Sequence, residues 1–154
     1  MTAVDAALGA WAPEAALELG VAESLVAPVS GRVGQLARLR IAWLLGGPAA
    51  LEHRRPEAIA SGLDEATLDA LSTWTTSPLF DETDRACLAL AEQFVIDVSA
   101  VTDADVEAVL DCLGPAGLYG FVQCLWVSDM TERLRLGLGA VLAGGPDDGQ
   151  GGRQ

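Results

Sequence analysis

Apolar residues recur at intervals of three and four along most of this chain, and they do not alternate with polar residues over any sustained run. Such intervals place side chains on one face of an α-helix, whereas a half-buried strand needs strict alternation. Leu118, Phe121, Val122 and Leu125 form one such face. Apolar residues make up 51% of the 154 residues, enough for a substantial core. The sequence therefore predicts an all-α protein.

Glycine and proline mark where the expected helices begin and end. The run GGP at 46–48 ends one helix, which begins near Gly31, and starts a second helix that stops at Gly62. The pair GP at 114–115 separates the last two helices in the same way. Asp64 and the pair Thr102/Asp105 stand where N-terminal caps of further helices are expected. The acids at 81–84 stand at the start of another helix, where the helix dipole favours negative charge.

These boundaries predict a single-domain bundle of about six to eight helices joined by short connections, with the main helical domain in residues 28–142. Residues 1–27 are expected to form an N-terminal arm that holds a weak helix around Pro13–Leu19 and ends near Pro28. Residues 143–154 are rich in glycine and polar side chains, and we expect a disordered tail there.

Charge excludes several kinds of partner. Twenty-two acids stand against nine bases, all of them arginine, and the formal net charge is −13. A protein of this charge is not expected to bind nucleic acid or an anionic membrane. The lack of lysine excludes Schiff-base chemistry.

Residues 1–20 carry no base, and the longest apolar stretch, Ile41–Leu51, is about half a membrane span, so we expect a soluble cytoplasmic protein.

The cysteines do not form a metal or disulfide motif. Cys87, Cys112 and Cys124 are odd in number, and none belongs to a C-x-x-C pair. They are either free thiols in a reducing compartment or residues with a redox role. The single histidine, His53, is far in sequence from all three, so we expect neither a zinc site nor another cofactor.

One part of the chain is basic. Residues 24–55 hold five arginines against Glu52 alone, a local charge of +4, which leaves −17 for the other 122 residues. Arginine binds carboxylates and phosphates through two parallel hydrogen bonds, so the cluster is a candidate site for a small anion. The alternative is that these arginines pair with acids of other helices or of a second subunit. The cluster comprises Arg32, Arg38, Arg40, Arg54 and Arg55.

Several short segments resemble one family. They are similar to the carboxymuconolactone decarboxylase and alkylhydroperoxidase D-like (AhpD-like) family. The segments are the run LARLRIAW at 36–43, the glycines at 46–47, the run RPEA at 55–58 leading to GL at 62–63, and the run DETDRACLALAEQF at 81–94. The resemblance covers roughly residues 28–142. It implies an all-α fold around a helical hairpin and a homo-oligomer, a trimer or hexamer, with a dimer as a further possibility.

The same resemblance places the family's site on residues that have been replaced. Gln35 stands where the family usually has glutamate, and Gly47 and Ala50 stand at the two cysteine positions. Arg54 stands at the histidine position, one residue after His53, and Asp129 falls near a position that is often asparagine in the decarboxylase branch. Without a thiolate at the site, thiol peroxidase chemistry is excluded. One residue rotates a helix by about 100°, so His53 and Arg54 cannot point the same way.

These observations suggest a cofactor-independent enzyme that acts on a small anionic organic molecule by proton transfer, as in decarboxylation, isomerisation or cyclisation. Arg54 or Arg38 would bind the anion, with Gln35 and Trp43 lining the pocket unless they belong to the core or an interface. His53 or Asp129 would move the proton.

Two questions stay open at this stage. Ser128, Asp129 and Glu132 interrupt an apolar helix, either as ion-pair partners of the arginines or as an acid/base pair. The alternative function is a non-catalytic family member that acts as a binding or assembly partner.

Overall fold

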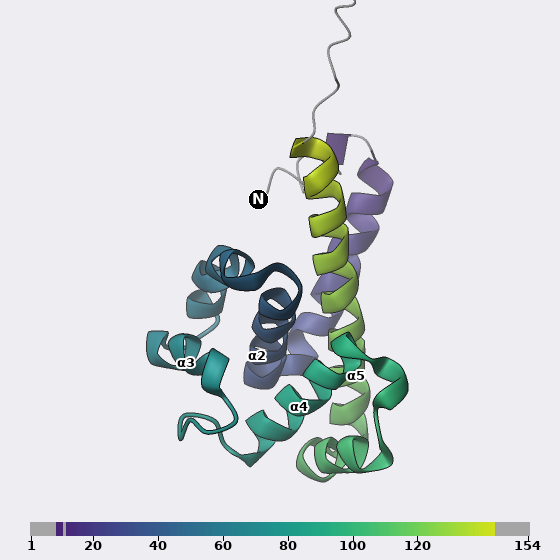
Figure 1. Ribbon diagram of the computed structural model, residues 1–154. Helices are drawn as coiled ribbons and strands as arrows, with labels where there is room; N and C mark the ends of the chain where they lie inside the picture. Colours follow the sequence, from purple (N-terminus) through teal and green to yellow (C-terminus); the bar gives the residue numbers. More distant parts are fainter. Residues whose placement is uncertain (1–8, 11, 144–154) are drawn as a thin grey trace, which may run out of the picture.

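Two long helices, α2 (Pro13–Ala60) and α5 (Asp103–Ala143), frame the computed structural model (Figure 1). The structure describes residues 9, 10 and 12–143; most of the predicted tail and the first residues of the predicted arm lie outside this part. Between the long helices lie α3 (Glu65–Ala70), η1 (Leu71–Thr73), α4 (Glu82–Ile96) and η2 (Val98–Ala100). The described residues contain no strand, and the predicted all-α class is confirmed.

Glycines with positive φ bend the two long helices at the predicted positions. Gly31 and Gly47 divide α2 into a first segment (13–30), a central segment (32–46) and a third segment (48–60). Gly114, with φ 69° and ψ 174°, separates a first segment of α5 (103–113) from a second (115–143). Three bends in four α-helices give seven α-helical segments in the described residues, within the predicted six to eight.

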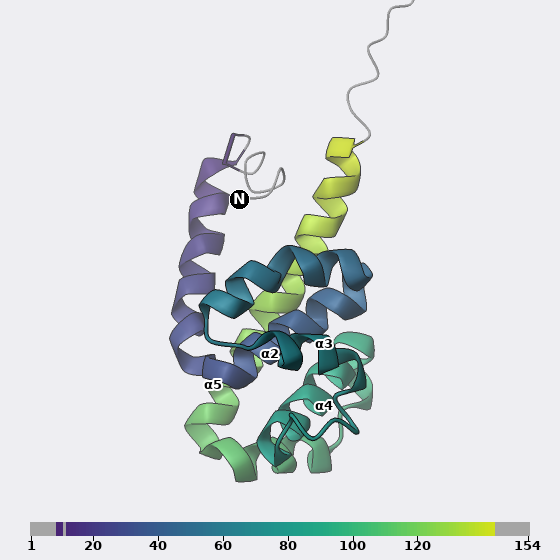
Figure 2. The ribbon, with the colours of Figure 1, turned by 90° about the vertical axis from the view of Figure 1, so that its left-hand side faces the viewer.

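The start of α2 differs from the prediction. Helix runs from Pro13 through Pro28 to the bend at Gly31, rather than stopping near Leu19. Residues 13–27 are dominated by alanine, glutamate and leucine, which favour helix, and the chain turns only where glycine permits a positive φ. Figure 2 shows this first segment (purple) and the end of α5 (yellow) projecting at the same end of the molecule.

The caps predicted at Asp64 and Thr102 are present, and Asp81 caps α4 as well. The side chains of Asp64 and Asp81 accept hydrogen bonds from the backbone N–H groups of Thr67 at 2.7 Å and of Asp84 at 2.8 Å. Thr102 and Asp105 form a reciprocal capping box: the Thr102 N–H donates to Asp105 Oδ2 at 2.8 Å, and the Asp105 N–H donates to Thr102 Oγ1 at 3.3 Å. Thr102 Oγ1 also donates to Asp105 Oδ2 at 2.7 Å, and this hydrogen bond, together with the one from the Thr102 N–H, lowers the pKa of Asp105.

The central segment of α2 is enclosed by its neighbours. One set of its side chains packs with α3, η1 and α4, and another packs with α4 and α5. The two clusters meet on this segment through Leu36 and Leu39 on one side and Ala37 and Ile41 on the other. The predicted residues Gln35, Arg38 and Trp43 are therefore carried by the most enclosed helical segment of the fold.

The bend at Gly47 allows a direct test of the fold. Gly47 adopts φ 67° and ψ −161°, a region open almost only to glycine, although a Cβ there would meet nothing within 4 Å. We expect Gly47→Ala to lower the free energy of unfolding by about 1–3 kcal/mol through backbone strain alone.

Gly137→Ala is the matched control. Gly137 lies inside α5 without a positive φ and also has open space around the Cβ position. Its replacement should raise the free energy of unfolding by up to about 1 kcal/mol, because alanine favours helix. Urea unfolding of both variants measures the difference, and equal effects of the same sign would contradict the assigned bend.

Candidate functional site

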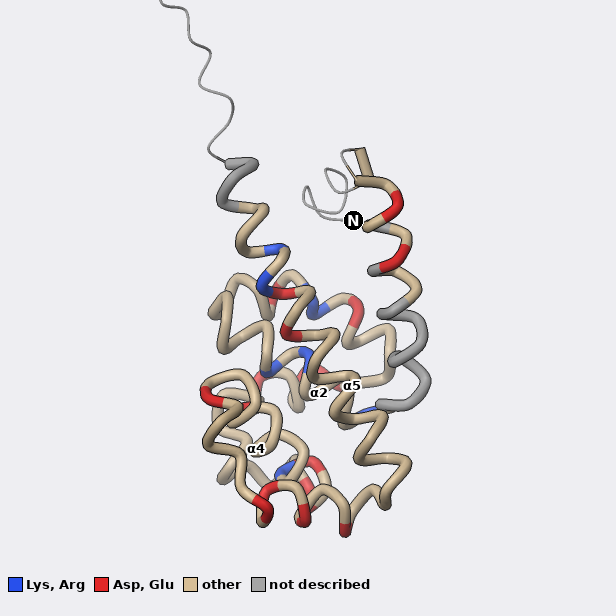
Figure 3. The backbone as a smooth tube through the Cα atoms, turned by 90° about the vertical axis from the view of Figure 1, so that its right-hand side faces the viewer, with Lys and Arg blue, Asp and Glu red and all other residues tan. Residues whose placement is uncertain are grey.

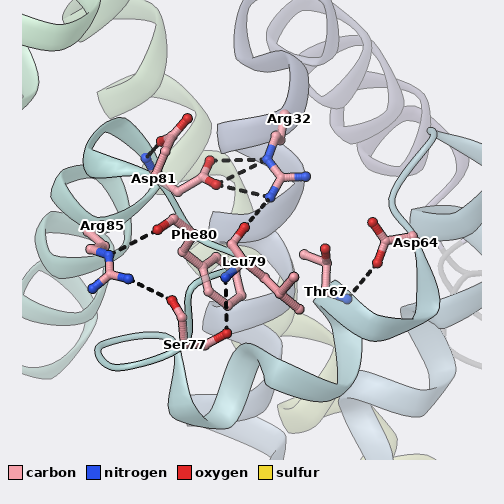
Figure 4. A network of polar contacts seen from close by, with 9 residues as sticks. Arg32, Asp64, Thr67, Ser77, Leu79, Phe80, Asp81 and Arg85 are labelled. Carbon is pink, nitrogen blue, oxygen red and sulfur yellow. Dashed lines mark hydrogen bonds and ion pairs between the residues drawn. The ribbon is translucent and has the colours of Figure 1, made fainter.

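Arg32 and Arg85 are structural anchors. Arg32 pairs with the buried carboxylate of Asp84, with Nη2 at 3.0 Å from Oδ2, and also donates to the Leu79 carbonyl at 3.2 Å. Arg85 donates to three backbone carbonyls, those of Thr75, Ser77 and Phe80. Figure 4 shows how the two guanidinium groups hold the connection between η1 and α4 from opposite sides. Both guanidinium groups are thus engaged by acceptors of the protein itself.

Arg40 is also engaged inside the protein. Its Nε donates to Glu92 Oε1, which also accepts a hydrogen bond of 2.7 Å from the indole N–H of Trp74. The guanidinium lies over the Trp43 ring, 4.3 Å from the ring centroid, in cation–π geometry. Trp43 is half-buried, so a substrate could reach only the part of the ring that Arg40 leaves uncovered.

Arg54 faces inward and His53 does not. The Arg54 side chain is only 13% exposed and pairs with the buried carboxylate of Glu132 on α5, whereas His53 is exposed. The Glu132 carboxylate also accepts a bond of 3.4 Å from Arg135. The sequence left open which of the two residues points inward, and in the structure it is Arg54. Glu132 was noticed in the sequence as a polar break in an apolar helix, but its partner could not be identified there.

Asp129 lies apart from this group in its contacts. Both of its carboxylate oxygens lie 2.9 Å from Arg133 Nε, one helical turn onward. Arg133 also donates to the Val95 carbonyl at 3.3 Å, and its ion pair with Asp129 raises the pKa of Arg133. The structure records no hydrogen bond or ion pair between Asp129 and either Arg54 or His53, so the predicted residues do not form one connected cluster among the described residues.

Arg55 binds a group of exposed acids. It pairs with Glu52 at 3.2 Å, with Asp69 at 2.7 Å and with Glu65, which ties the third segment of α2 to α3. The hydrogen bond that Arg55 donates to Asp69 is the main cause that raises the pKa of Arg55.

Arg38 differs from every other arginine that the structure describes. It is half-buried, and it makes no hydrogen bond or ion pair with any described residue. Gln35, one turn earlier on the same segment, is also half-buried and also makes no such contact within the described part of the chain. The free guanidinium and the free amide are therefore the groups that a ligand could engage without displacing an internal partner.

Two contacts place Arg38 along α5. Cys124 Sγ lies 4.0 Å from the Gly34 carbonyl oxygen, and a Cβ on Gly46 would lie 3.4 Å from Leu136 Cδ2. Both pairs are 90 residues apart, so the central segment of α2 and the second segment of α5 run side by side in the same direction. Arg38 lies between these contact points, on the length of α2 that runs beside residues 128–132 of α5.

The thiols are not arranged for redox chemistry. The resemblance places the family's two cysteines at Gly47 and Ala50, which carry no thiol. Burial raises the pKa of Cys87 to about 12, Cys124 is buried, and only Cys112 is exposed. In the described part of the chain no three histidine, cysteine or acidic side chains are grouped so that they could hold a metal ion.

Comparison with known proteins identifies the fold. No family model and no curated protein matches the sequence. A crystal structure of a protein of unknown function from Agrobacterium tumefaciens, described as a candidate antioxidant defence protein AhpD, is similar, with a TM-score of 0.75 and 20% identity. The match covers 84% of this chain and 90% of that chain. The chain therefore has an AhpD-like fold, as the sequence resemblance predicted.

The Arg54–Glu132 pair gives a stability prediction. Glu132→Gln removes the negative charge that faces two guanidinium groups at a buried position, and we expect the free energy of unfolding to fall by about 3–5 kcal/mol. Arg133→Gln is the control, because it breaks an ion pair whose arginine is largely exposed and should cost about 1 kcal/mol or less. Chemical denaturation of both variants tests the contrast, and similar losses would argue against a buried pair.

Thiol labelling tests the assignment of the cysteines. Because the pKa of Cys87 is about 12, its thiol stays protonated at pH 8, and burial also shields it from the reagent. We expect Ellman's reagent to modify one thiol per folded chain, and Cys112→Ser to abolish this reaction. Denatured protein should give three thiols. Rapid modification of the folded Cys112→Ser variant would show that a second thiol is reactive.

Proposed function

We propose that this chain is a cofactor-independent enzyme that binds a small organic anion at Arg38 and acts on it by proton transfer. The observation that carries the proposal is the half-buried Arg38 guanidinium, which has no partner among the described residues of a chain with 22 acids. A guanidinium partly removed from water favours an anionic partner, and a carboxylate matches its two parallel donors.

Neighbouring groups support a polar site. The Gln35 amide can add a donor and an acceptor one turn away on the same side of the segment. On the stretch of α5 that runs beside Arg38, the hydroxyl of Thr131 is fully buried and makes no hydrogen bond with the described residues. Buried polar atoms without a partner are rare in folded proteins, and a bound ligand or water would supply one.

Asp129 is the better of the two predicted proton-transfer residues. It lies on the same stretch of α5, its side chain is only 21% exposed, and Arg133 fixes the orientation of its carboxylate. His53 is exposed, so bulk water would compete with it for the proton. Arg54 is less suited than Arg38 to binding the anion, because Glu132 already occupies it.

The alternative is a non-catalytic binding protein of the same fold. The inward Arg54–Glu132 ion pair favours this alternative. Arg54 stands at the position where the resembled family keeps its proton-handling histidine, and its guanidinium is already bound to Glu132. We further propose that the chain is a member of the carboxymuconolactone decarboxylase and AhpD-like family and that it is located in the cytoplasm.

Binding and proton exchange test the two functions separately. We would titrate a panel of small mono- and dicarboxylic acids by ligand-observed NMR. We expect Arg38→Gln to weaken binding at least tenfold, because a charged hydrogen bond contributes about 1.5–3 kcal/mol. Arg55→Gln, on the exposed network, is the matched control and should bind as the wild type does. Equal binding by Arg38→Gln and the wild type would remove Arg38 from the site.

Deuterium incorporation or carbon dioxide release is then followed in D2O with the acids that bind. We expect Asp129→Asn to slow the reaction by about 10²–10⁴-fold while binding persists. Binding without any turnover in the wild type would favour the non-catalytic alternative, and no binding by any acid would contradict both.

A further inference from the structure

Two arginines of this chain pair with an acid that stands three residues before them. Glu52 pairs with Arg55 at 3.2 Å, and Glu132 pairs with Arg135 at 3.4 Å. This spacing places both side chains on one face of a helix, where opposite charges attract each other. The same spacing separates position 35 from Arg38, but position 35 holds a glutamine, and the structure records no hydrogen bond between these two side chains.

The neutral side chain at position 35 leaves the charge of Arg38 available to a ligand. All the other arginines that the structure describes are held by carboxylates or backbone carbonyls of the protein. Figure 3 shows such pairing on the upper turns of α5, where red and blue positions lie next to one another. A glutamate at position 35 would satisfy the Arg38 guanidinium in the same way and would repel an approaching anion.

Gln35 is itself a hydrogen-bonding group that the fold does not use. It is half-buried and makes no hydrogen bond with any described residue. Its amide offers N–H donors and a carbonyl acceptor, so it can bind a carbonyl oxygen or a hydroxyl group. The Cβ atoms of residues three apart on a helix lie about 5–6 Å from each other, so Arg38 and Gln35 can hold one small molecule at two points.

The charges around this pair favour a ligand with a single negative charge. The described acids on the stretch of α5 beside Arg38 are Asp129 and Glu132, and each is already paired with arginine. A second carboxylate on the ligand would therefore meet the neutral amide of Gln35 instead of a cation, and it would lose water without a charged partner. A hydroxyl or carbonyl oxygen is much less costly to desolvate and can form a hydrogen bond with the same amide.

We infer that Gln35 determines specificity and that the ligand is a monocarboxylic acid with a hydroxyl or carbonyl oxygen a few carbons from its carboxylate. The carboxylate accepts hydrogen bonds from Arg38. A carbonyl oxygen of the ligand accepts a hydrogen bond from the Gln35 amide N–H, and a hydroxyl group can also donate to the Gln35 carbonyl. This inference rests on the proposed anion site at Arg38 and names the class of substrate that the site selects.

Four acids of equal chain length test the class of substrate. Valerate carries one carboxylate, levulinate adds a ketone oxygen, γ-hydroxyvalerate adds a hydroxyl group, and glutarate adds a second carboxylate. We expect levulinate or γ-hydroxyvalerate to bind the wild type about three- to tenfold more tightly than valerate, because a neutral hydrogen bond contributes a factor of this size. Glutarate should bind no more tightly than valerate. Equal Kd values for valerate and both oxygenated acids, or tightest binding of glutarate, would overturn the inference.

Two variants separate the two roles of Gln35. Gln35→Leu removes the amide at similar volume, and we expect it to bind levulinate and valerate equally, with the Kd of valerate unchanged. Gln35→Glu should weaken the binding of all four acids at least tenfold, because the new carboxylate pairs with Arg38. Gln123→Leu, the same change at an exposed glutamine of α5, is the matched control and should keep the wild-type preference.

Failure of this inference differs from failure of the proposed function. If Arg38→Gln weakens binding but Gln35→Leu keeps the wild-type preference, the anion site stands and the role of Gln35 is wrong. Gln35→Glu that binds the acids as tightly as the wild type would likewise contradict the need for a neutral side chain. Binding of no acid, or equal binding by Arg38→Gln and the wild type, would remove the proposed site and this inference with it. If Gln35→Leu does not give the helical circular dichroism of the wild type, the four Kd values of the wild type decide the question alone.

Discussion

The enclosure of the central segment of α2 governs where this protein can place a charge. α3, α4 and α5 cover it, so a polar group on this segment loses water and needs a partner from another element. Arg40 has one in Glu92, 52 residues away, and stacks on Trp43. Arg38 shares the segment but has no partner among the described residues. The same constraint therefore explains both the buried ion pair and the candidate anion site beside it.

Local features of the fold could be predicted because their causes are local. The caps at Asp64 and Thr102 depend on side chains within three residues of the helix start, and the bends at Gly47 and Gly114 depend on glycine alone. The predicted end of the first helix near Leu19 was wrong, because the chain stays helical through Pro28 until Gly31 permits a turn.

The candidate site could be predicted only in part. The basic segment and the polar interruption of α5 were visible in the sequence, but the pairing of Arg54 with Glu132 spans 78 residues and depends on how α2 turns at Gly47. The rotation of the third segment after that turn decides that Arg54 is inward and His53 exposed. No pattern of spacing contains this information. The same is true of Arg38, whose lack of a partner among the described residues depends on where the described acids lie in the fold.

The bend at Gly47 limits which side chains this part of the fold can carry. The resemblance places the family's first cysteine at a residue whose φ and ψ only glycine tolerates well. A cysteine placed there would be strained before it could act. Thiol chemistry at this point would therefore require a change of the backbone as well as of the side chain.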